Sequence, residues 1–168
     1  MQRLEPSDIH RLNAALGWLG LSNPAEARAE LDAIAAEDQS HPAVLETRWL
    51  VCTHEQNWPA ALAVARTEMD IAPGNASGWL HRAYALRRAP DGGLLQAKEA
   101  LLPAAEIFPS EPVVAYNLAC YACQLEQLDE AREWFGQAVK VGGTEAVKKM
   151  ALADDDLKQL WPEIEKLK

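Results

Sequence analysis

Apolar residues recur along this chain at the three-and-four spacing of amphipathic helices, in stretches of roughly 14 residues. Turn-forming residues interrupt the pattern, for example at Ser22-Asn23, at Pro73-Gly74 and at Gly142-Gly143. The pattern predicts eight helices, near residues 8–20, 24–37, 42–55, 58–71, 76–89, 93–107, 112–125 and 128–141. Because alanine is abundant and β-branched residues are few, the expected fold class is all-α.

Proline marks several of the predicted helix starts. Asn23 precedes Pro24, which places a capping side chain before a proline in the first turn, where a missing N–H costs nothing. The same proline signal recurs at His41-Pro42, Trp58-Pro59 and Glu111-Pro112. Pro103 and Pro162 instead fall inside helical patterns, and each is expected to kink or split its helix.

The segment after Thr144 has one apolar and one polar side at helical spacing. Its apolar positions are Val147, Met150, Leu157, Leu160, Trp161, Ile164 and Leu167. An array of stacked helices needs such an element at its end to shield the last apolar surface. Residues 144–168 are therefore predicted to form two shorter helices that act as a C-terminal cap.

Alanines recur at a near-constant interval along the chain. Ala27, Ala61, Ala97 and Ala131 are separated by 34, 36 and 34 residues. A period in this range, with two helix-length segments in each unit, is typical of stacked helical hairpins that cannot bury their apolar faces alone. The two extra residues of the third unit fall at the turn Pro90–Gly93, where insertions are tolerated.

These residues resemble the tetratricopeptide repeat, and the fourth unit resembles it most. Leu118-Ala119 stands at the leucine-small step of the first helix, and Ala131, Phe135 and Ala138 stand at the small, aromatic and small positions of the second. The second unit departs from the pattern because Trp49 occupies a normally small position. The resemblance covers about residues 8 to 143 and implies a right-handed α-solenoid with repeats near 8–39, 42–73, 76–109 and 112–143. The chain length predicts one domain over residues 1–168, with the cap at 144–168.

In the tetratricopeptide-repeat family the first helix of each repeat lines a concave groove, so the resemblance also implies where a partner would bind. The implied partner-binding residues are Leu12, Leu16, Leu50, His54, Leu80, Tyr84, Arg87, Arg88, Tyr116, Asn117, Cys120 and Gln124. This groove is largely apolar, which suits a partner helix or an extended segment with aliphatic anchors. Tyr84 and Tyr116 are expected as aromatic contacts, and Arg87 and Arg88 as ligands of a carboxylate.

Other occupants of the groove fit the same residues. The last helix of the chain could fill it, or a neighbouring copy could, which would make the protein a self-associating subunit. A secretion-type chaperone that shields an apolar segment of a client is a further alternative. Family members that clamp the C-terminal carboxylate of chaperones use asparagines and basic residues on successive first helices, and here only Asn117 matches, so this mode is not expected.

Composition and charge limit the classes of partner and the cellular location that we expect. The net charge of −9 disfavours binding to nucleic acid or to anionic membranes. The first residues show no basic region followed by an apolar core, which is the pattern of a signal peptide, and no apolar run approaches roughly 20 residues. The three cysteines fit a reducing compartment, so a cytoplasmic protein is expected.

The sequence offers little chemistry for catalysis. Cys120 and Cys123 have the spacing of a redox or metal motif, but they lie inside a predicted helix, where packing is the simpler role. The four histidines fall on different segments without a catalytic partner. We therefore expect no catalytic residues, no metal and no cofactor, and a protein-protein interaction scaffold rather than an enzyme.

Overall fold

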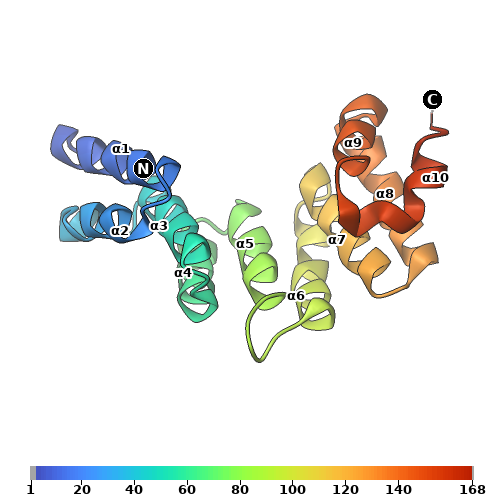
Figure 1. Cartoon of the computed structure of the whole chain (residues 1–168), viewed down its shortest axis with the longest axis horizontal. Coiled ribbons are helices and arrows are strands. Elements are labelled where there is room, and N and C mark those ends of the chain that lie inside the picture. The colour runs from blue at the N-terminus through green and yellow to red at the C-terminus, as the bar shows by residue number, and fades with distance from the viewer. Residues whose placement is uncertain (1–2, 168) are drawn as a thin grey trace. The chain divides into compact units, whose positions relative to one another are not determined.

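The computed structural model describes residues 3–167, and these contain helices and turns but no strand. The helices follow the predicted order along the chain (Figure 1). Their bounds are α1 Pro6–Gly20, α2 Pro24–Asp32, α3 Pro42–His54, α4 Trp58–Ile71, α5 Ser77–Leu86, α6 Leu94–Ile107, α7 Pro112–Gln124, α8 Leu128–Gly142, α9 Thr144–Ala151 and α10 Trp161–Ile164, with 3-10 helices η1 Ala36–Asp38 and η2 Asp155–Leu160. The all-α class is confirmed.

The chain divides into two compact units at the bond between Ala85 and Leu86. The first unit holds the hairpins α1–α2 and α3–α4 together with α5 up to its penultimate residue. The second holds α6, the hairpin α7–α8 and the C-terminal elements α9, η2 and α10. A single domain over residues 1–168 stays a prediction.

The repeating alanines lie in the cores of these units, as their spacing indicated. Ala27, Ala61, Ala97 and Ala131 are each 0% exposed. A methyl group at these positions allows the backbones of neighbouring helices to approach closely, and a larger side chain would strain the packing.

The predicted helix starts are confirmed by their capping contacts. Asn23 accepts a hydrogen bond from the backbone N–H of Glu26 at 3.4 Å, and Asn57 accepts one from Ala60 at 3.2 Å. Glu111 caps α7 in the same way through its carboxylate, which accepts from the N–H of Val113 at 3.3 Å. Each cap satisfies a backbone donor that the first turn of a helix leaves unpaired.

Three hairpin turns share a left-handed backbone conformation that the sequence did not predict. Ser22, Gln56 and Glu126 adopt positive φ values of 57°, 54° and 61°, each two residues before the second helix of a hairpin. In each turn the next residue donates its N–H back to the first helix, as Asn57 does to the carbonyl of Cys52 at 2.8 Å. This is the helix-ending arrangement that glycine favours, yet none of the three residues is glycine.

The two prolines within helical patterns have different outcomes. Pro103 was expected to kink or split its helix, and it does not split it, because α6 continues from Leu94 to Ile107. Proline has no N–H, so the backbone carbonyl of Glu99, four residues earlier, lacks its helical donor. Glu99 and Pro103 are both exposed, so water can donate to that carbonyl instead. Pro162 does divide the tail, because it stands in the first turn of α10 directly after η2.

The C-terminal elements cover the hairpin α7–α8 and complete the core of the second unit. Leu157, Leu160 and Ile164 are at most 1% exposed and pack in one cluster with Phe135. The tail therefore caps the unit as its apolar pattern predicted.

A buried charge links α6 to the start of α8 in the same unit. The ammonium of Lys98 on α6 donates to Glu130 Oε2 at 2.7 Å and to Gln127 Oε1 at 2.7 Å.

We predict that Gln56→Gly stabilises the fold. The exposed Gln56 is held at a φ of 54°, which glycine adopts without the steric cost that a Cβ brings. Urea unfolding should show a gain of about 0.5 to 1 kcal/mol. Gln56→Ala is the matched control and should give no gain, because it keeps the Cβ; a lower midpoint for the glycine variant than for the original chain would contradict the interpretation of this turn.

Candidate protein-binding surfaces

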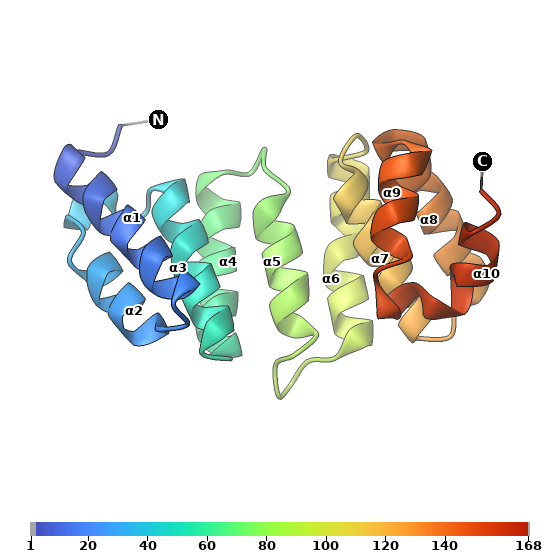
Figure 2. The same cartoon turned by 45° about the horizontal axis from the view of Figure 1, so that its top comes forward.

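An apolar surface of the first unit is formed by five of the predicted partner-binding residues. We call it the leucine face and define it as Leu12 and Leu16 of α1, Leu50 of α3, and Leu80 and Tyr84 of α5. Each pair within α1 and α5 is spaced four residues apart and so shares one side of its helix. α1 and α3 pack side by side (Figure 2), and both Leu12 and Leu50 rest on the core cluster of that hairpin pair.

The leucine face is only partly covered by the rest of the first unit. Leu16 is 44% exposed and Tyr84 is 37% exposed, while Leu12, Leu50 and Leu80 are half-buried. His54, also predicted to contact a partner, is exposed near the end of α3. The structure thus places six predicted residues where another molecule can reach them.

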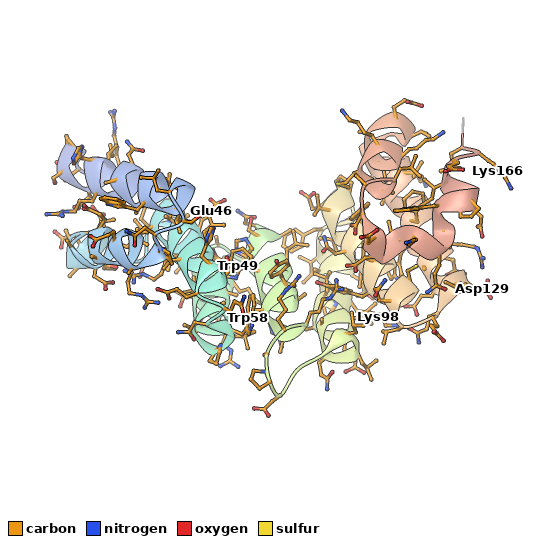
Figure 3. The ribbon with its side chains drawn as sticks, viewed as in Figure 1. Glu46, Trp49, Trp58, Lys98, Asp129 and Lys166 are labelled. Atoms are coloured by element: carbon orange, nitrogen blue, oxygen red, sulfur yellow. The ribbon has the colours of Figure 1, made fainter. Side chains whose placement is uncertain are left out.

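Aromatic rings support the Tyr84 side of this face. Trp49 stacks on His81 with ring centroids 3.9 Å apart, and the ring of Tyr84 meets Trp49 edge-on at 5.5 Å. The ring of Trp58 also approaches that of Tyr84, with centroids 6.3 Å apart; Trp49 and Trp58 are labelled in Figure 3. These contacts hold the Tyr84 ring in place before any partner binds, which lowers the entropy cost of using it as an anchor.

A polar contact of one of these rings, His81, joins α5 to α4. His81 Nδ1 lies 2.7 Å from Glu68 Oε2, and Glu68 is buried. Gly78 makes the close approach possible, since a Cβ there would lie 2.8 Å from the Met69 side chain and 2.9 Å from its backbone nitrogen. Sequence reasoning did not find this cluster, although Trp49 at a normally small position was a signal for it.

The predicted residues of α7 do not line an open surface. Tyr116 is 5% exposed and Cys120 is 3% exposed, because the chain's own segment after Leu152 lies over them. Tyr116 Oη donates to Asp154 Oδ2 at 2.9 Å, and Cys120 Sγ lies 3.6 Å from the same oxygen. The expectation of an accessible groove is corrected here: the alternative occupant, the end of the same chain, takes this place.

Two further predicted residues hold the covering segment. Arg87 pairs through both terminal nitrogens with the carboxylate of Asp156, one contact at 2.9 Å. Gln124 Nε2 donates to the backbone carbonyl of Asp156 at 3.0 Å. The carboxylate expected for Arg87 is thus supplied by this chain. Of the other predicted residues, Asn117 donates to the carbonyl of Val113 within α7, and Arg88 is half-buried.

The physical reason for the covering is the composition of α7. Apart from Asn117, every residue from Val114 to Cys123 is buried, and these residues are distributed around the whole helix. A helix that is apolar on nearly all sides must be covered on nearly all sides, so α7 needs a second layer besides α8. α6 packs on part of this remaining surface, and residues 152–160 cover another part, with Leu157 and Leu160 in the interior.

Burial also sets the chemistry of the α7 side chains. It raises the pKa of the Cys120 thiol, and the nearby charges of Asp154 and Asp156 raise it further. Burial likewise raises the pKa of Cys123 and raises the pKa of Tyr121 to about 12. Thiols that stay protonated are poor nucleophiles, which favours a packing role for the two cysteines over a redox role.

Neither a cluster of metal ligands nor a membrane-length helix occurs in the part of the chain that the structure describes. Between residues 3 and 167, no three His, Cys, Asp or Glu side chains are grouped so that they could hold a metal ion. Over the same stretch, none of the helices combines the length and the apolar character needed to cross a bilayer.

One hollow of the second unit was not anticipated from the sequence. A cleft of about 420 Å³ lies between the end of α6, the start of α7 and the end of α8. Its apolar lining includes Phe108, Pro109, Val114 and Val141. No sequence motif marks it, because its walls come from three separate helices.

We predict that Tyr84 and Tyr116, which the sequence pattern places in the same role, differ in their effect on stability. Tyr116→Phe removes a hydrogen bond to Asp154 inside the covered surface and should lower the free energy of unfolding by about 1 kcal/mol. Tyr84→Phe, on the exposed face, is the matched control and should change it by less than about 0.5 kcal/mol. Urea unfolding measures both, and equal effects would contradict the assignment of one covered and one open surface.

Comparison with known proteins supports the fold alone. No family model matches the chain, and no curated protein matches it either. Among solved structures, it is similar to TTC0263, a thermophilic TPR protein of Thermus thermophilus, with a TM-score of 0.70 at 17% identity over 94% of this chain and 82% of that one. It is also similar to MamA residues 41 to the end from Desulfovibrio magneticus RS-1, with a TM-score of 0.66 at 17% identity over 98% and 97% of the two chains.

A MamA RS-1 ArsTM double mutant gives a third match, with a TM-score of 0.65 at 17% identity over 84% of this chain and 79% of that one. The matched structures are helical-repeat proteins, and the hairpins α1–α2, α3–α4 and α7–α8 have the paired helices and buried alanines that the sequence predicted. The chain therefore has a tetratricopeptide-repeat-like fold.

Proposed function

We propose that the chain is a protein-protein interaction scaffold and that the leucine face is where a partner peptide or helix binds. The observation that carries this proposal is the contrast between two apolar surfaces. The α7 surface is covered by the chain itself, whereas Leu16 and Tyr84 of the leucine face stay exposed beside three half-buried leucines. Contiguous exposed apolar surface on a folded protein marks a place where another molecule binds.

The chemistry of the face fits a protein partner. Leucine side chains at helical spacing accept the apolar side of an amphipathic helix, and a supported tyrosine ring is a frequent anchor at interfaces. The net charge of −9 disfavours nucleic acid or an anionic membrane as the partner. The proposed role needs no catalytic group, metal or cofactor, and the expected location is the cytoplasm.

Affinity capture from native extract tests the proposal. The original chain should retain a partner that Leu16→Asp and Tyr84→Ala both lose. Leu21→Asp is the matched control, because Leu21 is 72% exposed at the turn after α1 and lies outside the leucine face. It should retain the partner.

Light scattering distinguishes the self-associating alternative. A monomer is expected from the original chain, since the proposed occupant of the face is a different protein. A stable dimer that Leu16→Asp converts to a monomer would contradict the proposal and would show that a second copy covers the face. Equal capture by the original chain and both face variants would also contradict it.

A further inference from the structure

The repeat register allows the two apolar surfaces to be compared position by position. Ala131 lies 70 positions after Ala61, and the same step relates α7 to α3. Tyr116 then corresponds to Glu46, Cys120 to Leu50, and Gln124 to His54. The residues that α7 uses to hold a segment therefore have counterparts on α3.

At the α7 surface, polar side chains of α7 and of the residue after α5 contact the acids of the segment that lies there. The hydroxyl of Tyr116 donates to Asp154, and the guanidinium of Arg87 pairs with Asp156. Apolar residues of the same segment fill the space beside these contacts, as Leu157 does at 0% exposure. Hydrogen-bond donors of the covered surface therefore contact aspartates of the segment, and its apolar positions contact leucines of the segment.

On α3, the polarity at the corresponding position is reversed. Glu46 takes the place of Tyr116 and can accept hydrogen bonds but, when ionised, cannot donate one. It is exposed on α3, one turn before Leu50 and near Trp49 in sequence (Figure 3). Leu12 on α1 and Leu80 on α5 stand at the same register position in the preceding and following repeats.

The cations of the first unit do not neutralise Glu46. Arg48 on the same helix reaches Asp32 at 2.7 Å and Gln39 at 2.7 Å instead. Arg11 pairs with Glu30 and Arg28 pairs with Glu55. Within residues 3–167, Glu46 forms neither an ion pair nor a side-chain hydrogen bond.

The charge around this position is negative overall. Residues 1–85 contain six arginines and no lysine against eleven aspartates and glutamates. Glu68 borders the same small hollow as Glu46, together with Ile71 and Asn75, and its carboxylate contacts His81. A partner that brings a positive charge to this place would meet a complementary field.

We propose that the leucine face, together with Glu46, binds an amphipathic partner segment in which apolar side chains flank a single lysine or arginine. The apolar side chains pack on Leu16, Leu50 and Tyr84, and the basic group pairs with the Glu46 carboxylate. This inference rests on the proposed function and adds to it the charge of the partner.

Two synthetic probes test the inference. Both are fluorescein-labelled helical peptides of the same length with leucines at positions i, i+3, i+4 and i+7, and they differ only in a central lysine or glutamate on the apolar side. Fluorescence anisotropy should show that the original chain binds the lysine peptide about tenfold more tightly than the glutamate peptide. High salt should reduce that preference.

Charge reversal gives the decisive comparison. Glu46→Lys should reverse the preference, so that the glutamate peptide binds more tightly. Asp70→Lys makes the same change in net charge at an exposed residue of α4 outside the face, and it should keep the preference for lysine. Circular dichroism checks that both variants fold, and the salt dependence with the original chain tests the inference without any variant.

The outcomes separate this inference from the proposed function. Equal affinity for both peptides, lost in Leu16→Asp, would overturn the charge inference while supporting partner binding on the leucine face. Binding of neither peptide would overturn the inference, and the capture experiment would still decide the proposed function. An unchanged preference in Glu46→Lys would also overturn it.

Discussion

The need to cover both sides of apolar helices shapes each unit of this protein. A helical hairpin buries one side of each helix against its partner and leaves the other side to be covered by a neighbouring element. Small side chains such as Ala61 and Ala131, both fully buried, bring the paired helices close together. What covers the remaining sides then decides which surfaces are core and which can bind another molecule.

The second unit meets this need with its own chain. The segment that follows α9 places Leu157 and Leu160 in the core, where Asp154 accepts from Tyr116 of α7 and Asp156 pairs with Arg87 after α5. Polar contacts orient this segment while apolar burial holds it. Because three large side chains of the tail are almost fully buried, the tail is part of the folded unit and not a loosely attached extension.

The first unit leaves its corresponding positions partly open. The rings of Trp49 and His81 stack beside Tyr84 and support it within the leucine face without covering the face. Glu46 adds a charge where α7 has a hydroxyl. The two surfaces share a register but differ in polarity, so the segments that they are proposed to select carry opposite charges.

Much of this architecture could be predicted from the sequence. Local signals set the helices, since Asn23 and Asn57 are caps whose partners lie three residues away, and the alanine period marked the buried contacts. The sequence could not show that the tail covers Tyr116 and Cys120, because Asp154 lies 38 residues from Tyr116 and no local pattern pairs them. The ring cluster was missed for the same reason, since Trp49 and His81 come from different hairpins.

In the folded protein the leucine face is open and the α7 surface is closed, and the proposed binding role depends on this difference. Hydroxyl-radical footprinting read by mass spectrometry tests it most directly, because both surfaces carry a reactive tyrosine. The expected result is rapid oxidation of Tyr84 and protection of Tyr116 until the chain unfolds. Equal oxidation of the two tyrosines in the folded protein, or protection of Tyr84 in a dilute monomer, would contradict it.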